Sequence, residues 1–204
     1  DRRSQQKGKF QTGLVKDKYN TLFVSQGTPT GEVAMLTFLL ITKTTRLFDE
    51  LGMREKMLER LREYLREPQA IVVFTALPGD GLSASWLGML KAIDRLMRDF
   101  VSIEDVNKRE PELENVDINV YDPAKGENVA AFVAKLKLKQ PDTYIVPEIP
   151  DGAAVDAVCE QIADEGKNAI FSIRSREALE ALQRIAALKP DVPRFLKYVK
   201  AVVN

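Results

Sequence analysis

Short apolar runs alternate with amphipathic stretches from residue 53 onward, and this alternation limits the folds open to the chain. Residues 70–75 (AIVVFT) form a continuous apolar run, which is typical of a strand buried on both faces of a sheet. Residues 153–165 and 176–187 instead repeat their apolar side chains at helical spacing. Because strands that alternate with helices pair in parallel beneath those helices, we predict an α/β fold with a mostly parallel sheet.

The predicted elements fall into two parts. In residues 1–42, polar turn residues separate extended runs, and we predict strands over residues 9–14, 19–25 and 32–40. Three strands without a helix cannot easily build an independent core. We therefore expect them to be the end of a preceding β-containing domain, in a chain that begins abruptly and is a piece of a longer protein. Residues 43–52 are predicted to be a linker.

In residues 53–204, strands and helices are predicted in turn. A helix from residue 53 ends before Pro68. The other predicted helices are residues 83–98, 127–139, 153–165, 176–187 and 192–203. The predicted strands are residues 70–75, 100–104, 117–121, 143–148 and 168–173, with a polar loop over residues 105–116. Ligands of such sheets bind outside the carboxyl ends of the strands, which places a site after Thr75, Glu104, Glu148 and Ile173.

Composition excludes several classes of function. The chain has no histidine, which excludes a histidine general base, a Ser-His or Cys-His pair and a histidine metal ligand. Its single cysteine, Cys159, excludes an intramolecular disulfide and a cysteine-cluster zinc site, and fits a reducing compartment. Basic and acidic residues balance at 30 each, so no net charge draws the chain to nucleic acid. The sequence contains no run of about 20 apolar residues, so no segment is predicted to be inserted in a membrane.

The segment after Thr75 lies where a nucleotide-binding fold places its phosphate loop. That loop has the pattern G-x-x-x-x-G-K-[ST] between a buried strand and a helix. Here Ala76 stands at the first glycine, Gly81 at the second, Leu82 at the lysine and Ser83 at the hydroxyl position. Two matches in four leave a simpler alternative open, in which a Pro-Gly-Asp-Gly turn only joins the strand to the helix.

The other strand ends carry further motifs. Residues 100–105 (FVSIED) resemble the acidic segment of secretion ATPases, and residues 140–151 (QPDTYIVPEIPD) resemble their second nucleotide motif. Residues 166–177 (GKNAIFSIRSRE) resemble their histidine segment, with Arg174 where the histidine belongs. In the order and spacing of these motifs, the chain from about residue 8 to residue 188 resembles the ATPases of type II secretion and type IV pilus assembly.

This resemblance implies a RecA-like P-loop NTPase domain over residues 53–204, preceded by strands of a PAS-like N-terminal domain over residues 1–42. It implies a hexamer that binds Mg-ATP between subunits and drives pilin or pseudopilin assembly at the cytoplasmic face of the inner membrane. The partners would be the inner-membrane platform proteins of a secretion or pilus system. Glu104 and Glu148 would then be catalytic, and Ser83 would bind Mg²⁺. The nucleotide-binding positions would be Gly79, Asp80, Gly81, Leu82, Ser83 and Arg174.

Several departures from the family pattern remove chemistry that ATP requires. The phosphate-loop lysine holds the β- and γ-phosphates by charge, and Leu82 cannot. A unit-charge pair near 4 Å contributes roughly 4 kcal/mol at an effective dielectric constant of about 20, so its loss weakens affinity by roughly three orders of magnitude. Asp80 adds negative charge beside the phosphates, and Pro147 and Pro150 cannot donate a backbone hydrogen bond to them.

Other parts of the apparatus remain. The backbone N–H groups at the start of the helix that holds Ser83 form an anion site, and Glu104 and Glu148 could position a metal ion or water. Each acid has a plainer alternative, as a solvated strand-end residue or a helix cap. Arg174 either replaces the missing positive charge or is a surface or interface arginine.

Three functions are compatible with these residues. The leading hypothesis is a pseudo-ATPase that binds Mg-ATP weakly or not at all and acts as a structural or regulatory subunit. The alternative is a functional but atypical ATPase that powers pilin or pseudopilin assembly with Arg174, or a residue of a neighbouring subunit, in place of the lysine. The third is a strand-end crevice that binds another anion or small ligand.

Overall fold

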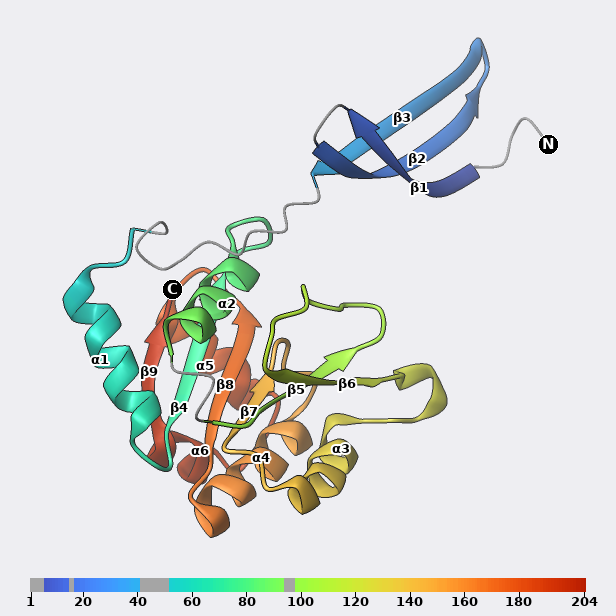
Figure 1. Cartoon of the computed structure of the whole chain (residues 1–204). Coiled ribbons are helices and arrows are strands. Elements are labelled where there is room, and N and C mark those ends of the chain that lie inside the picture. The colour runs from blue at the N-terminus through green and yellow to red at the C-terminus, as the bar shows by residue number, and fades with distance from the viewer. Residues whose placement is uncertain (1–5, 15–16, 41–51, 94–97) are drawn as a thin grey trace. The chain divides into compact units, whose positions relative to one another are not determined.

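The computed structural model describes residues 6–14, 17–40, 52–93 and 98–204, and the chain divides into two compact units, Asp1–Thr45 and Arg46–Asn204 (Figure 1). The predicted linker, residues 43–52, lies outside the described residues except for Gly52. Within the described part of the chain, no helix is both long and apolar enough to cross a membrane.

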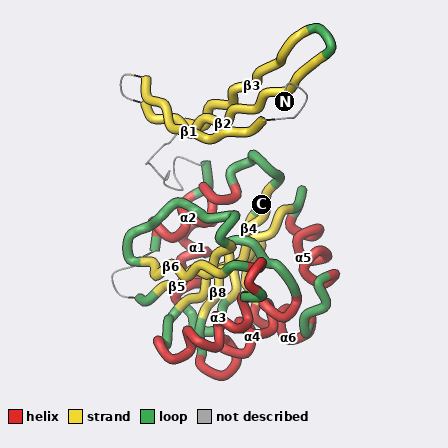
Figure 2. The backbone as a smooth tube through the Cα atoms, turned by 90° about the vertical axis from the view of Figure 1, so that its right-hand side faces the viewer, coloured by secondary structure: helices red, strands yellow, loops and turns green. Residues whose placement is uncertain are grey.

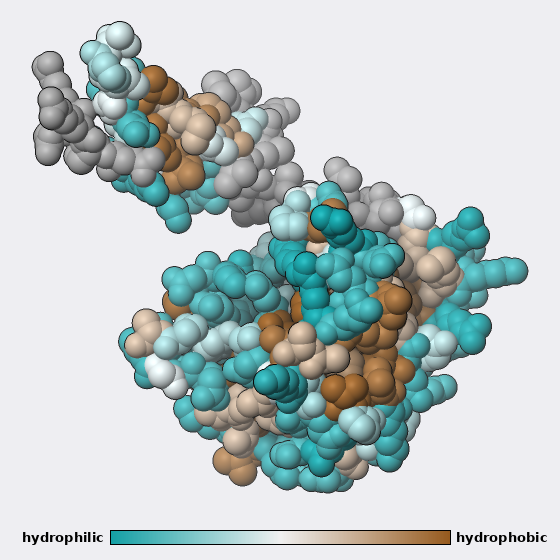
Figure 3. Space-filling model, turned by 180° about the vertical axis from the view of Figure 1, so that it is seen from behind, coloured by the Kyte–Doolittle hydropathy of each residue, from teal (hydrophilic) through white to brown (hydrophobic). Residues whose placement is uncertain are grey.

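The first unit is a three-stranded antiparallel sheet in the order β1-β2-β3, and it confirms the three predicted strands. They are β1 (Gln6–Leu14), β2 (Asp17–Thr28) and β3 (Gly31–Leu40). Phe10, Thr21 and Phe38 lie opposite one another across the sheet, which buries Thr21 between two aromatic rings. Hydrophobic side chains gather on the surface of this sheet (Figure 3), and the large exposed ones are Phe10, Val33, Met35, Leu36 and Phe38. Three strands alone therefore bury little of their apolar surface.

The second unit is built on a six-stranded sheet whose neighbouring strands are all parallel, in the order β6-β5-β7-β8-β4-β9. The strands are β4 (Ile71–Ala76), β5 (Phe100–Asp105), β6 (Val116–Tyr121), β7 (Thr143–Val146), β8 (Asn168–Arg174) and β9 (Val199–Val203). The helices are α1 (Glu55–Arg66), α2 (Leu82–Ala92), α3 (Val129–Leu136), α4 (Gly152–Glu165), α5 (Ala178–Ala187) and α6 (Val192–Tyr198). Short 3₁₀ turns lie at Pro123–Lys125 and Lys137–Lys139.

The core lies in two layers, one on each face of this sheet. Helices lie on both sides of the strands (Figure 2). Successive side chains of a strand point to opposite faces. Along β4, Ile71 and Val73 accordingly join one cluster, while Val72 and Phe74 join the other. Buried residues of α1 and α2 cover the face of Val72, and those of α3, α4 and α6 cover the face of Ile71. This two-sided burial explains why residues 70–75 are apolar without alternation.

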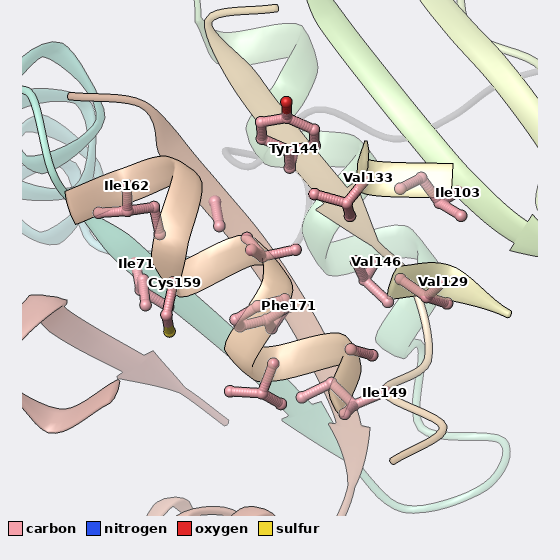
Figure 4. Close-up of a cluster of buried hydrophobic side chains, with 14 of the residues drawn as sticks. Ile71, Ile103, Val129, Val133, Tyr144, Val146, Ile149, Cys159, Ile162 and Phe171 are labelled. Carbon is pink, nitrogen blue, oxygen red and sulfur yellow. The ribbon is translucent and has the colours of Figure 1, made fainter. Parts of the chain in front are cut away.

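The larger cluster contains the single cysteine (Figure 4). Cys159 of α4 is fully buried beside residues such as Ile71 and Phe171, and burial raises the pKa of its thiol to about 12. The thiol is therefore protonated at neutral pH and acts as a small apolar side chain.

Local signals set the ends of the helices on this face. The Asp151 carboxylate accepts a 2.8 Å hydrogen bond from the Ala154 N–H at the start of α4, and Asn128 caps α3 in the same way at 2.9 Å. Gly166 ends α4 with a φ of 68°, a left-handed conformation that favours glycine.

The structure corrects the prediction for the C-terminal tail. Residues 192–203 were expected to form one helix, but α6 ends at Tyr198 and Val199–Val203 is the edge strand β9, parallel to β4. Three of these five residues are valine, which favours strands, and pairing with β4 satisfies their backbone groups.

The predicted helix over residues 83–98 ends at Ala92 in the described residues, and residues 94–97 lie outside them. The strand that begins at Thr143 ends at Val146, before Pro147.

Candidate functional site at the carboxyl edge of the sheet

The carboxyl ends of the central strands meet beside the first turn of α2. A cavity of about 330 Å³ opens there between four segments of the chain. Its lining residues are Leu82, Ser83, Lys108, Arg109, Glu110, Pro147, Glu148, Ile173 and Arg174. Three of the side chains are basic and two are acidic. Ser83, Leu82, Glu148 and Arg174 were predicted as site residues, and they share this cavity because parallel strands end at the same edge of the sheet.

The connection from β4 to α2 is a tight turn. The Asp80 N–H donates a 3.1 Å hydrogen bond to the Leu77 carbonyl, and Gly79 and Gly81 adopt φ values of 92° and 82°. Such angles strain any residue with a Cβ, which explains the glycine at both positions. Gly79, Asp80 and Gly81 are exposed, and none of the three lines the cavity. Gly81 is the N-cap of α2.

Leu82, which we predict to stand at the position of the phosphate-loop lysine, has a side chain that is 4% exposed. It belongs to the hydrophobic cluster that includes Phe74, Trp86 and Leu90. At the start of α2 the chain thus presents an aliphatic side chain that is packed into the core and touches the edge of the cavity. Leu82 can neither carry a charge nor donate a hydrogen bond to a phosphate.

The Ser83 hydroxyl donates a 2.9 Å hydrogen bond to Oε1 of Glu110, which lies in the loop after β5. Burial raises the pKa of Glu110 above its ordinary value, and the negative charges of Glu104 and Glu148 act in the same direction. The Ser83 hydrogen bond and the positive charge of Arg174 oppose this rise. The hydroxyl expected to reach Mg²⁺ is therefore engaged by a carboxylate of the same chain.

Glu104 lies at the end of β5 and is 3% exposed. Both oxygens of its carboxylate accept hydrogen bonds, Oε1 from the Ser102 hydroxyl at 2.7 Å and Oε2 from the Glu110 N–H at 3.1 Å. Glu104 thus holds the loop after β5 in place, and it does not itself line the cavity around Ser83.

Glu148 follows β7 and forms an ion pair of 2.7 Å with Lys108 of the same loop. Both side chains are about half exposed, so water screens the pair and its contribution to stability is small. A smaller cavity of about 60 Å³ lies beside this pair, with Glu104 and Tyr121 among its lining residues.

Arg174 ends β8 on the opposite side of the cavity. Its Nη1 donates a hydrogen bond of 3.4 Å to the Leu77 carbonyl in the turn after β4. The hydroxyls of Thr75 and Ser175 share a hydrogen bond just behind it and join the ends of β4 and β8. Arg174 lines the cavity together with Ser83, and its positive charge opposes the rise in the pKa of Glu110.

Sequence reasoning missed Glu110 and Lys108. Both belong to the polar loop predicted over residues 105–116, which has no apolar periodicity to reveal how it folds. The available signal was its position, because a charged loop that leaves the carboxyl end of a central strand lies at the ligand-binding edge.

The arrangement around the cavity differs in several respects from the pattern predicted for a Mg-ATP site. No described group of three or more His, Cys, Asp or Glu side chains is placed to hold a metal ion. Ser83 is bonded to Glu110, and Leu82 supplies no charge.

A sequence profile described as "Type II/IV secretion system protein" matches residues 1–203. The chain belongs to this secretion-system family. The match extends over both units, and it confirms the resemblance that the strand-end motifs indicate.

Three relatives show how far the likeness extends. The type IV pilus assembly ATPase PilB of Thermus thermophilus is 25% identical over 155 residues, which are 76% of this chain and 17% of PilB. The structure of the ATPase DotB of Legionella pneumophila has a TM-score of 0.68 at 13% identity, over 96% of this chain and 56% of DotB. The pilus retraction motor PilT with bound ADP has a TM-score of 0.64 at 17% identity, over 98% of this chain and 58% of PilT. The chain thus spans a minor part of PilB and just over half of the two structures, and it shares the fold of DotB and PilT.

Proposed function

We propose that this chain is a pseudo-ATPase of a type II secretion or type IV pilus-like system, with weak or absent Mg-ATP binding and negligible hydrolysis. The observation that carries the proposal is Leu82, an aliphatic side chain packed into the core at the lysine position of the phosphate loop. PilT, a structural neighbour, holds ADP in its solved structure, so the fold is compatible with a nucleotide. The proposed loss of nucleotide binding in this chain is then due to its side chains, because the fold itself is shared with PilT.

The loss of the lysine charge is large enough, in free energy, to abolish Mg-ATP binding at micromolar concentrations. Without a compensating cation, the loss of roughly 4 kcal/mol moves a micromolar ligand to the millimolar range. Glu110 and Asp80 add negative charge near the first turn of α2, which weakens phosphate binding further. Glu104 and Glu148, the proposed catalytic acids, are held by hydrogen bonds and an ion pair to the same loop.

The role that fits such a subunit is structural or regulatory. We place it in a ring of the hexameric type expected for the family, either with its own copies or among active subunits, at the cytoplasmic face of the inner membrane. The platform proteins of the secretion or pilus system are its proposed partners, and the balanced charge does not favour nucleic acid. The proposed domain boundaries are residues 1–42 for the PAS-like strands, residues 43–52 for the linker and residues 53–204 for the RecA-like domain.

Thermal unfolding with and without millimolar Mg-ATP tests the proposal. A ligand at 100 times its dissociation constant adds about 2.7 kcal/mol to the free energy of unfolding, which is plain in the melting temperature. We expect no shift, and no release of phosphate by the full-length protein above the buffer control. PilT measured in parallel is the positive control for nucleotide binding. Saturable binding at micromolar Mg-ATP together with turnover would overturn the proposal.

An atypical ATPase is the second candidate, and the position of Arg174 favours it. Arg174 lines the same cavity as Ser83, where a cation from β8 could stand in for the lysine. This alternative predicts a clear thermal shift with Mg-ATP that disappears in Arg174→Ala. The lysine variant Arg174→Lys keeps the charge and is the matched control. Mg-ATP binding that is unchanged in Arg174→Ala would contradict this alternative, because Arg174 would then not supply the positive charge.

A further inference from the structure

The loop between β5 and β6 folds back over the candidate nucleotide site. Its first residues form a compact turn, in which the Asp105 carboxylate accepts a 2.8 Å hydrogen bond from the Asn107 N–H and the Asp105 carbonyl accepts one of 2.9 Å from Lys108. The Val106 N–H bonds the carbonyl of Tyr121 at the end of β6. The loop is thus tied to the two strands that it joins, and its residues Lys108, Arg109 and Glu110 line the cavity.

Three contacts hold the middle of this loop against the residues predicted to serve nucleotide chemistry. The Glu110 side chain bonds the Ser83 hydroxyl at 2.9 Å, and the Glu110 N–H bonds Glu104 at 3.1 Å. Lys108 pairs with Glu148 at 2.7 Å. A single loop of ten residues, 106–115, therefore engages the proposed metal ligand and both proposed catalytic acids.

The Glu110 carboxylate lies where an anionic ligand would be most favourable. The first turn of a helix attracts negative charge through its unpaired N–H groups and its dipole. Arg174 lines the same cavity, and its positive charge opposes the rise in the pKa of Glu110. The Glu110 carboxylate thus accepts the hydroxyl of a serine in the first turn of a helix, in a cavity that an arginine also lines, and such groups bind phosphate in other proteins.

We propose that Glu110 is a built-in competitor for this site, whose carboxylate holds Ser83 and excludes the phosphates of a nucleotide from the first turn of α2. The inference rests on the proposed function, because it takes the cavity to be a degenerate nucleotide site. It adds a second cause of weak binding to the missing lysine, and this cause can be removed by moving one loop.

Equilibrium binding of Mg-ATP to the full chain tests this, with calorimetric titration of the natural protein, Glu110→Ala and Glu110→Gln. Glu110→Ala removes both the charge and the hydrogen bond to Ser83, and it should bind roughly tenfold more tightly or better, as expected for a like charge removed near the phosphates. Glu110→Gln keeps an oxygen for Ser83 and removes only the charge, so an intermediate gain is expected. Glu114→Ala is the matched control, since this exposed acid of the same loop does not line the cavity, and its affinity should equal that of the natural protein.

The outcomes separate this inference from the proposed function. Equal affinity of Glu110→Ala and the natural protein would overturn the inference, and so would an equal gain in Glu114→Ala. Absence of binding in every variant would also overturn it, while leaving the pseudo-ATPase proposal intact. Tight binding and turnover by the natural protein would refute the pseudo-ATPase proposal. The ratio of the Mg-ATP affinities of Glu110→Ala and the natural protein would still decide the role of Glu110. Should Glu110→Ala fail to fold by circular dichroism, the nearly isosteric Glu110→Gln decides alone.

Discussion

The hydroxyl of Ser83 donates a 2.9 Å hydrogen bond to the carboxylate of Glu110, which lies 27 residues further along the chain. This contact joins the first turn of α2 to the loop after β5, across the edge of the sheet where nucleotides bind in related folds. It places an acid of the protein beside the helix turn at which the proposed function puts the phosphates of a nucleotide. In the proposed function, two features weaken nucleotide binding here, the leucine at the lysine position and the carboxylate of Glu110.

Leu82 should contribute to stability as a core residue. Leu82→Ala removes a side chain that is 4% exposed and packed near Trp86, so the free energy of unfolding should fall by about 2–5 kcal/mol. The control is Leu138→Ala, which truncates a leucine that is 90% exposed and should change stability by less than about 0.5 kcal/mol. Urea denaturation measures both. A loss below about 1 kcal/mol for Leu82→Ala would mean that the side chain lies outside the core.

Glu110 should make the stability of the protein depend on pH. Burial raises its pKa in the folded protein above the ordinary value of 4.5, so the folded state binds this proton more tightly than the unfolded state does. The free energy of unfolding should then fall as the pH rises from that ordinary value through the raised pKa. Glu110→Gln lacks this titration, and its stability relative to the natural protein should increase over the same pH window.

Denaturant unfolding of both proteins at a series of pH values measures this difference. The Ser83 hydroxyl can still donate to the glutamine, so the comparison isolates the charge of Glu110 among its neighbours Glu104, Glu148 and Arg174. Parallel pH curves for the two proteins would contradict the raised pKa.

Asp151 should act as a helix cap. Its carboxylate accepts the hydrogen bond of the Ala154 N–H, and Asp151→Ala should lower the free energy of unfolding by about 1 kcal/mol. Asparagine caps helices nearly as well as aspartate does, so Asp151→Asn should retain most of that stability. An equal loss in both variants would show that the charge, not the cap, is what α4 requires.

Much of the fold could be predicted from the sequence because burial leaves a direct pattern. Residues 70–75 are apolar without alternation since β4 is covered on both faces, and the antiparallel strands before residue 42 are separated by polar turn residues. The strand β9 could not be predicted, because Val199–Val203 is too short for its periodicity to distinguish strand from helix. Its pairing with β4, more than 100 residues earlier, decides the conformation.

The candidate site could be predicted only in part, for the same reason. Ser83, Glu148 and Arg174 follow strands or begin a helix, so the parallel sheet brings them to one edge and one cavity. Glu110 lies in a loop without periodicity, and only the folded chain places it on Ser83. Long-range contacts of this kind leave no local signal in the sequence.

Calorimetric titration of Mg-ATP into the natural protein and into Leu82→Lys tests the central claim most directly, since Leu82 touches the cavity and a lysine there can extend its charge toward the phosphates. We predict no saturation of the natural protein at low millimolar Mg-ATP. The affinity of Leu82→Lys should rise by as much as roughly three orders of magnitude, with a further gain of roughly tenfold where Glu110 is also replaced by alanine. Saturation of the natural protein at micromolar Mg-ATP, with no gain in the lysine variants, would contradict the account.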